Sequence, residues 1–383
     1  MVTTESCDPG DARYGIWMPA PAMRDLLRAL LDIAPPTPAA MALLRQGLAP
    51  DAEPGLRRLI PLALARPWAA TLDPAWHAQA ADEGRRAAVR ALAFQHFAER
   101  MIRGLNAERI EVLLLKGYPL GQLVYDDPSH RPAADLDLLV HPEDVGRARA
   151  WFEGQGFRPI AEVLDPRVSH ALCLRHGQER FEIDLHWKAL YCARWTHADD
   201  GFWRRAVRFD TPAGTALTLS PSDHLIHACL HGREGNLLSP FRWIVDAGQI
   251  LRRQGGRLDW ALVIEVAMDQ RYPGPLAGCL RYLREVIGLP IPVEVVDRLE
   301  AAPMPAADRI FFRLRRSGGL RSGLLSRAAA LILLYGRHRH ASGGGALGFF
   351  EWLRLRWHLD AARELPLATL RRSLASLRRP PPQ

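Results

Sequence analysis

Residues 113 to 140 read LLLKGYPLGQLVYDDPSHRPAADLDLLV, in which an apolar run ends at Lys116-Gly117 and a second apolar run carries Asp135 and Asp137. Side chains alternate between the two faces of an extended strand, so these carboxylates share one face, roughly 6.5 Å apart at their α-carbons. Buried anions need a positive partner. We expect both carboxylates to reach a common pair of divalent cations, which in two-metal sites lie roughly 4 Å apart.

A later stretch, FEIDLHW at residues 181–187, repeats this alternation, with Glu182, Asp184 and His186 on its polar face. We expect Asp184 to be the third carboxylate in preference to Glu182, because Asp184 lies in mid-strand and its shorter side chain would hold a metal more rigidly. Oxygen ligands and a phosphate substrate favour Mg²⁺, with Mn²⁺ as the alternative. The competing interpretation is an edge strand whose polar residues point into solvent.

Lys116-Gly117 is typical of a strand that turns into a helix. The first backbone N–H groups of such a helix favour a phosphate group, and Gly117 allows the backbone to approach it closely. We therefore expect Lys116 and Gly117 to bind a nucleotide. Arg131, in the loop before Asp135, is expected either to clamp a polyphosphate oxygen or to pair on the surface with the acidic residues 126–127.

These residues point to a family. Leu115-Lys116-Gly117, Arg131, the strand at 135–140 and Gly156-Phe157 resemble the uncharacterised nucleotidyltransferase family of the polymerase-β-like superfamily. The resemblance continues through the stretch 184–187 and covers residues 110 to 251 or so. It departs at Tyr118, because the wider superfamily usually has Gly-Ser or Gly-Gly at the place of Gly117-Tyr118.

The resemblance implies a small mixed sheet whose carboxylates bind two Mg²⁺ ions and drive nucleotidyl transfer from an NTP, with ATP as the expected donor. Asp135 and Asp137 would be metal ligands, and Asp184 would help to activate the acceptor hydroxyl. Family members occur in bacterial biosynthetic clusters for lasso peptides and surface polysaccharides, which implies a peptide or saccharide acceptor. Phosphoryl transfer is a variant. The alternative function is a non-catalytic nucleotide-binding or scaffold protein of a biosynthetic complex.

Two further residues are expected near the site. Lysine occurs only at Lys116 and Lys188, and both border the site segments, so Lys188 is a candidate alongside Glu182 and His186. His231 begins a segment that the family shares. It also belongs to a helical face with Asp223, His224 and His227, which is interpreted either as a zinc site or, preferably, as a hydrogen-bonded polar face.

The periodicity predicts an α+β fold in which a small mixed nucleotidyltransferase-type sheet is flanked by helical regions. The expected order is a flexible tail (1–20), an N-terminal helical region (21–108), an α/β catalytic core (109–219), a C-terminal helical domain (220–375) and a disordered tail (376–383). Within the C-terminal domain, Arg242 and Asp246 are four residues apart and are expected to form an ion pair. Its arginine-rich segments between residues 311 and 358 are expected either to pack inward or to form a surface for a membrane, a carrier-bound substrate or a leader peptide.

The bulk composition agrees with a folded protein of the cytoplasm. The chain has 383 residues, of which 48% are hydrophobic, and a formal net charge of +8. Its cations are spread along the chain, so nucleic acid is not strongly indicated. The five cysteines form no CxxC pair, the N-terminus lacks the pattern of a signal peptide, and no apolar stretch approaches the ~20 residues of a transmembrane helix.

Overall fold

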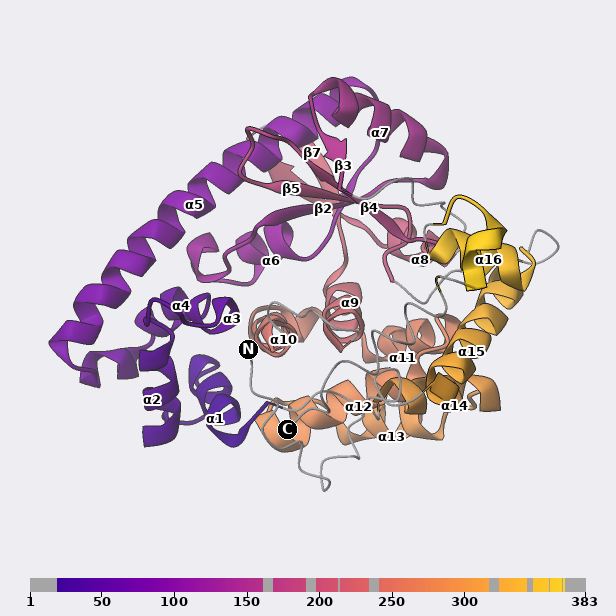
Figure 1. The fold of residues 1–383 in the computed structure, drawn as a ribbon. Helices are drawn as coiled ribbons and strands as arrows, with labels where there is room; N and C mark the ends of the chain where they lie inside the picture. The colour runs from indigo at the N-terminus through magenta and orange to yellow at the C-terminus, as the bar shows by residue number, and fades with distance from the viewer. Residues whose placement is uncertain are drawn as a thin grey trace.

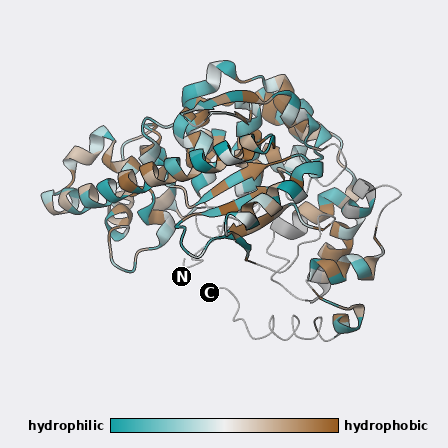
Figure 2. Cartoon of the chain, turned by 90° about the horizontal axis from the view of Figure 1, so that it is seen from above, coloured by the Kyte–Doolittle hydropathy of each residue, from teal (hydrophilic) through white to brown (hydrophobic). Residues whose placement is uncertain are grey.

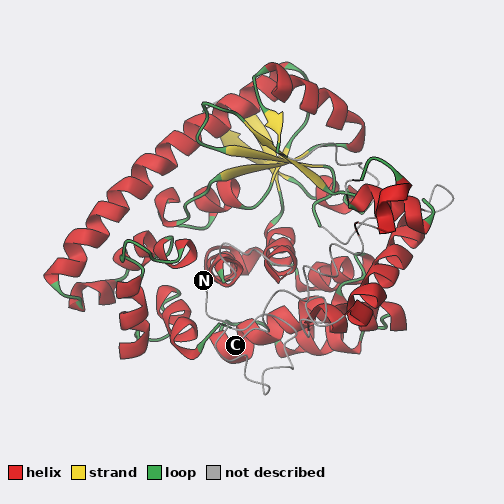
Figure 3. Cartoon of the chain, in the orientation of Figure 1, coloured by secondary structure: helices red, strands yellow, loops and turns green. Residues whose placement is uncertain are grey.

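The fold is taken from a computed structural model that describes residues 19–160, 168–190, 198–212, 214–233, 241–316, 324–342, 347–357, 359–366 and 368. The expected C-terminal tail (376–383) and nearly all of the expected N-terminal tail (1–20) lie outside these residues. Within them, the strands form a mixed β-sheet, and helical regions precede and follow these strands in the sequence (Figure 1, Figure 3). The predicted α+β fold is therefore confirmed.

The N-terminal helices precede all strands. They are α1 (Pro21–Leu30), α2 (Pro38–Gln46), α3 (Pro54–Arg57), α4 (Ile60–Leu64) and α5 (Pro74–Ala107), with the short 3₁₀ helix η2 (Pro67–Thr71) before α5. Side-chain caps start two of them: the Thr37 hydroxyl accepts from the backbone of Ala40, and the Asp73 carboxylate accepts from that of Trp76. Proline at the first helical position follows both caps.

The described strands form one sheet in the order β3-β4-β5-β2-β1-β7-β6. The strands are β1 (Leu113–Leu114), β2 (Asp135–Leu139), β3 (Arg158–Pro159), β4 (Ala171–Arg175), β5 (Glu182–His186), β6 (Val207–Thr211) and β7 (Gly214–Thr218). Between them lie α6 (Gly117–Leu123), η3 (Pro128–His130), η4 (Pro142–Asp144), α7 (Val145–Gly154) and α8 (Asp200–Arg204). The pairs β1–β7 and β2–β5 are parallel, and the other neighbours are antiparallel.

The first strand is shorter than the sequence predicts. In the apolar run that ends at Lys116-Gly117, only Leu113 and Leu114 have regular strand pairing. The cause lies at its start, where the backbone N–H of Ile110 donates to the carbonyl of Leu105 and completes the end of α5. Arg109 makes this reversal with a left-handed φ of 55°. The end of the run still joins the sheet, because the N–H of Leu115 donates to the carbonyl of Asp137.

The sheet has an apolar face and a polar face. The apolar face packs against α5 and α7 and forms a core in which Phe94, Phe97 and Phe152 meet the inward residues of β2, β4 and β5. Helices α6, α9 and α10 lie on the other side of the sheet (Figure 1). Hydrophobic and hydrophilic segments alternate along strands and helices (Figure 2), as expected where each element covers a core with one face.

The chain continues as helices after the β6–β7 hairpin. They are α9 (Pro221–Arg233), α10 (Arg242–Gln254), α11 (Trp260–Asp269), α12 (Pro273–Tyr282), α13 (Val293–Ala301), α14 (Ala306–Arg316), α15 (Leu324–Ser342) and α16 (Phe349–Arg356). Gly232 permits close packing of α9 and α10, because a Cβ there would lie 2.1 Å from Cβ of Trp243. In the described part of the arginine-rich region, Phe311 and Trp352 are buried, whereas Phe350 is exposed. No helix in the described ranges is both long and apolar enough to cross a membrane.

Candidate metal centre

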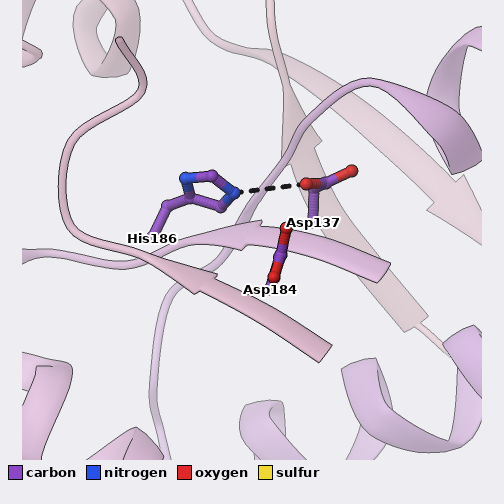
Figure 4. A group of neighbouring side chains, drawn as sticks. All are labelled: Asp137, Asp184 and His186. Carbon is purple, nitrogen blue, oxygen red and sulfur yellow. Dashed lines mark hydrogen bonds and ion pairs between the residues drawn. The ribbon is translucent and has the colours of Figure 1, made fainter. Parts of the chain in front are cut away.

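Asp137, Asp184 and His186 come together on the polar face of the sheet (Figure 4). Strands β2 and β5 are parallel, and their register sets Asp137 directly beside Asp184. Each of the three side chains offers one ligand atom, and these atoms all lie within 4.8 Å of one another. His186 follows Asp184 at the next position on the same face of β5, and its Nε2 lies 3.2 Å from Oδ1 of Asp137.

The ammonium of Lys116 lies at the same carboxylate. Its Nζ is 2.5 Å from Oδ1 of Asp137, with the side chains of Lys116 and Asp137 only 16% and 3% exposed. The backbone of Lys116 has φ 50° and ψ −111°, a conformation that L-residues rarely adopt. Such strain, of order 1–3 kcal/mol, is concentrated at functional sites in proteins.

Burial and crowding raise the pKa of two carboxylates of this face. Burial, followed by the neighbouring Asp137, raises the pKa of Asp184 to about 7, and the same two causes raise the pKa of Asp135. Burial alone would lower the pKa of Lys116, but Asp137 and Asp184 outweigh it, so that this pKa lies above its ordinary value. Lys116 is therefore the charged partner of a group of carboxylates that cannot all be ionised cheaply without a cation.

The residues fit a divalent metal. Asp137 and Asp184 supply hard oxygen ligands on rigid strands, as Mg²⁺ and Mn²⁺ prefer. Burial and the nearby Lys116 ammonium lower the pKa of His186 well below its ordinary value, so the imidazole is neutral. Its Nδ1 is buried without a hydrogen-bond partner among the described residues. A neutral imidazole either donates from Nε2 to Asp137 and orients it, or offers the Nε2 lone pair to a cation.

The other two carboxylates on this face have different surroundings. Asp135, two residues before Asp137 on β2, is partly exposed and lies outside the group of three. In the β2–β5 register Asp135 is opposite Glu182. Glu182 is occupied by Arg175, whose Nε donates to its Oε1 over 2.7 Å, and by the Cys173 thiol at 3.6 Å. The structure thus places Asp184, and not Glu182, beside Asp137.

Gly117, the first residue of α6, lies close to Arg131, and the ring of Tyr118 lies in the apolar core. Gly117 is buried, and a Cβ there would lie 3.2 Å from Nη1 of Arg131. Tyr118, which departs from the wider superfamily, points into the apolar core, with its ring 6.0 Å from that of Phe94 and 5.5 Å from that of Phe209. α6 itself has only seven residues, so its dipole is a weak source of charge.

Arg131 makes a buried pair that the sequence did not suggest. Its Nε and Nη2 donate to the two carboxylate oxygens of Asp246 on α10, over 2.9 and 2.8 Å. Tyr125 donates to the same Asp246 over 2.6 Å. The expected surface pair of Arg131 with Asp126 or Asp127 is therefore wrong, because those acids lie at the solvent-facing start of the loop and Asp126 pairs with Arg66 and Arg253 instead.

The expected ion pair between Arg242 and Asp246 is replaced as well. Arg242 donates from Nη1 to the carbonyl of Pro132 over 2.7 Å, while Asp246 is taken by Arg131 and Tyr125. These long-range pairs connect α10 to the loop that precedes β2. One sequence signal could have revealed it: Asp246 stands inside the apolar stretch WIVDAGQIL, where an unpaired carboxylate would be costly.

The histidines of α9 are hydrogen-bonded and do not converge on a metal. The Nε2 atoms of His224 and His227 lie 3.1 Å from the Thr218 hydroxyl and from the Ala189 carbonyl, respectively. The carboxylate of Asp223 accepts hydrogen bonds from Nε and Nη2 of Arg205. The preferred polar-face interpretation agrees with these contacts, and the zinc interpretation does not.

The remaining two candidates are His231 and Lys188. His231 is half-buried, stacks on His227 at 5.4 Å and lines a small cavity together with Lys116. Lys188, beyond the end of β5, pairs with Asp199, Nζ to Oδ2 3.5 Å apart.

Comparison with known proteins adds one finding. A family model described as an uncharacterised nucleotidyltransferase matches residues 57–288, more than half of the chain. The match includes α4, α5, the whole sheet and helices α9 to α12. No curated protein matches the sequence.

Proposed function

Since the chain belongs to the uncharacterised nucleotidyltransferase family, we propose that it is a cytoplasmic, metal-dependent enzyme that moves a nucleotidyl group from an NTP to a hydroxyl-bearing acceptor. ATP is the proposed donor and Mg²⁺ the proposed metal, with Mn²⁺ as a substitute; transfer of a terminal phosphoryl group is the variant. One observation carries the proposal: Asp137, Asp184 and His186 bring their donor atoms within 4.8 Å of one another on a rigid sheet.

The side chains have separate roles in this proposal. Asp135, Asp137 and Asp184 hold the metals, and His186 orients or supplements Asp137. A bound metal supplies charge neutralisation at the attacking and leaving oxygens. Asp184, which lies beside Asp137 in the register of β2 and β5, is placed to take the proton of the acceptor hydroxyl. The acceptor oxygen then forms a bond to the α-phosphorus, and the bond to the departing pyrophosphate breaks in line.

The acceptor is proposed to be a peptide or a saccharide in a bacterial biosynthetic pathway, such as the tailoring of a peptide natural product of the lasso class. The support for this part is the resemblance of the chain to proteins of such clusters. In this proposal the residues of the metal centre act on the reacting groups, so they are not expected to select the acceptor.

The test is transfer of label from ATP. The protein is incubated with α-labelled ATP, Mg²⁺ or Mn²⁺ and a panel of peptide and saccharide acceptors, and we expect labelled acceptor together with pyrophosphate. Asp137→Asn should abolish the label, because it removes the ligand shared by the group. Asp210→Asn, on the exposed β6–β7 hairpin, is the matched control and should keep the activity. γ-Labelled ATP in a parallel assay separates phosphoryl from nucleotidyl transfer.

The second candidate is a nucleotide-binding scaffold without turnover. The observation in its favour is the Lys116 ammonium, 2.5 Å from Asp137, which already neutralises the central carboxylate. ATP binding that is insensitive to divalent metal, with no label transferred to any acceptor of the panel, would establish this function and exclude the enzyme.

A further inference from the structure

A small cavity lies between the Lys116 turn and the helices α9 and α10. Its volume is about 50 Å³, enough for a few water molecules or one phosphate group, since a water molecule needs about 10–15 Å³ of such space. Its wall combines the polar side of α9 with residues of α6, α10 and the loop before β2, namely Lys116, Leu120, Arg131, His224, His227, Ala228, His231, Gly232, Arg242, Trp243 and Asp246.

The charge of this wall is unbalanced. Lys116 is paired with Asp137, and Arg131 occupies Asp246, the carboxylate of the wall, with Nε and Nη2. The third nitrogen of Arg131, Nη1, is directed instead toward Gly117, where it would lie 3.2 Å from an added Cβ. Arg242 donates one bond to the Pro132 carbonyl and has no carboxylate partner among the residues that the structure describes.

A further cation comes from the N-terminal helices. Arg58, at the end of α3, is half-buried, and its guanidinium makes no hydrogen bond or ion pair to any described residue. It is near enough to Asp135, Arg131 and Arg242 to act on their charges. Burial, followed by Arg131 and Arg58, lowers the pKa of Arg242 to about 10. Cations held together in this way are stabilised by an anion between them.

The histidines of the wall do not supply that anion. Thr218 donates its hydroxyl proton to the carbonyl of Leu114, so it must accept from Nε2–H of His224. His227 likewise donates to the Ala189 carbonyl. Burial lowers the pKa of both imidazoles to about 3, so both are neutral. The wall thus has a net positive charge, with neutral imidazoles beside it.

We propose that this cavity receives one phosphate group from the tail of the donor nucleotide, held by Arg131 Nη1, by Arg242 and by Arg58 at its rim. The proposal rests on the proposed function, and it assigns α3 and α10 to the donor and not to the acceptor. Lys116 lies at both sites, bonded to Asp137 and lining the cavity, so a phosphate here would be next to the carboxylates. Guanidinium groups suit the task because they bind phosphate oxygens with directed pairs of hydrogen bonds.

The test is binding to the full chain at fixed salt, measured by calorimetry with Mg²⁺ for ATP, inorganic tripolyphosphate and adenosine. Arg242→Gln and Arg58→Gln should each weaken ATP and tripolyphosphate by about tenfold or more, the value of a charge-assisted bond, and leave adenosine unchanged. Arg253→Gln is the matched control, since this arginine of α10 is 49% exposed and pairs with Asp126. Arg242→Lys should restore part of the affinity.

The outcomes separate the two proposals. If the wild-type protein binds metal and ATP but both glutamine variants bind ATP as tightly, the phosphate site is wrong and the proposed function stands. If the variants weaken tripolyphosphate but not ATP, the cavity serves a phosphate of the acceptor, and our assignment is overturned. A wild-type protein that binds neither ATP nor tripolyphosphate would overturn both proposals. Arg58→Gln keeps the test valid if Arg242→Gln does not fold, because the Arg58 guanidinium has no hydrogen bond or ion pair to any described residue and the substitution leaves its backbone cap of α3 in place.

Discussion

The ammonium of Lys116 is bonded to the carboxylate of Asp137, Nζ to Oδ1 2.5 Å apart, at the centre of the group in which a metal would be held. Lys116 is therefore both the internal counter-ion of these carboxylates and a competitor of any divalent cation. A metal that takes Oδ1 of Asp137 must displace this ammonium, which can then turn toward the cavity that it also lines.

This relationship predicts the effect of Lys116→Met. Removing one partner of a buried pair should cost about 3 kcal/mol of unfolding free energy without metal. Methionine keeps the Cβ and therefore the backbone strain, so the loss reports the charge. Because no ammonium has to be displaced, Mg²⁺ or Mn²⁺ should stabilise the variant more than the wild-type protein. Thermal melts across a metal titration measure both effects.

Lys188→Met is the control for that experiment, since Lys188 is the other lysine of the chain and pairs with Asp199 away from the metal centre. It should lower the melting temperature without any change in the response to metal. Equal metal-induced shifts in Lys116→Met and in the wild-type protein would show that Lys116 does not compete with the metal.

The sequence identified Asp137 and Asp184 of the candidate metal centre, but it preferred Asp135 to His186 as their companion. Period-two alternation is a local property of a strand, so the shared face of Asp135 and Asp137 and the same pattern at Asp184 could be recognised without knowing the fold. That β5 lies parallel to β2, with Asp184 in register with Asp137, was not predicted. The Lys116–Asp137 bond joins residues 21 apart through a backbone conformation that sequence patterns do not announce.

The long-range ion pairs could not be predicted for a physical reason. The guanidinium of Arg131 is stabilised by whichever carboxylate shares its burial, and local acids such as Asp126 were the nearest in sequence. Packing of α10 against the loop decided in favour of Asp246, 115 residues away. The proximity of Arg58 to this group could not be predicted either, because its position depends on how the N-terminal helices pack beside the loop at 126–131.

Gly117 and Gly121 on α6 predict opposite effects of the same substitution. A Cβ at Gly117 would lie 3.2 Å from Nη1 of Arg131 and from Cβ of Ala133, whereas one at Gly121 would have its nearest contact at 3.8 Å. Gly117→Ala should lose about 1 kcal/mol or more through overpacking and weaken ATP binding by displacing Arg131. Gly121→Ala should gain about 0.5 kcal/mol from helix propensity.

Urea unfolding and ATP calorimetry on the two glycine variants check this prediction together. If alanine at Gly117 were as harmless as at Gly121, the close approach of Arg131 to the turn would not constrain the protein. The two positions belong to one helix, so a general effect of alanine on α6 cancels in the comparison.

The buried pair of Arg131 and Asp246 predicts strong coupling. Asp246→Asn and Arg131→Gln should each lower the free energy of unfolding by about 3 kcal/mol, because each leaves a desolvated charge without its partner. The double variant should lose clearly less than the sum, since it leaves no charge unpaired. Urea unfolding of the four proteins gives the coupling energy. Additive losses would mean that the two side chains act independently and that the pair does not tie α10 to the loop.

His224 predicts how the protein responds to acid. Burial lowers its pKa from 6.5 to about 3, so between these values the unfolded chain binds a proton that the folded protein excludes. Stability contributed by the neutral imidazole is therefore present above pH 6.5 and falls as the pH falls toward 3. Between pH 7 and pH 5 this amounts to about 2 kcal/mol.

His224→Gln retains a donor for Thr218 but does not titrate, so its free energy of unfolding should fall by about 2 kcal/mol less than that of the wild-type protein over this range. His96→Gln, at an exposed position of α5, should keep the wild-type dependence. Urea unfolding at several pH values checks the prediction. An unchanged pH dependence in His224→Gln would show that His224 takes up its proton over the same pH range in the folded and unfolded protein. The imidazole would then not stay neutral in the cavity wall at pH 5.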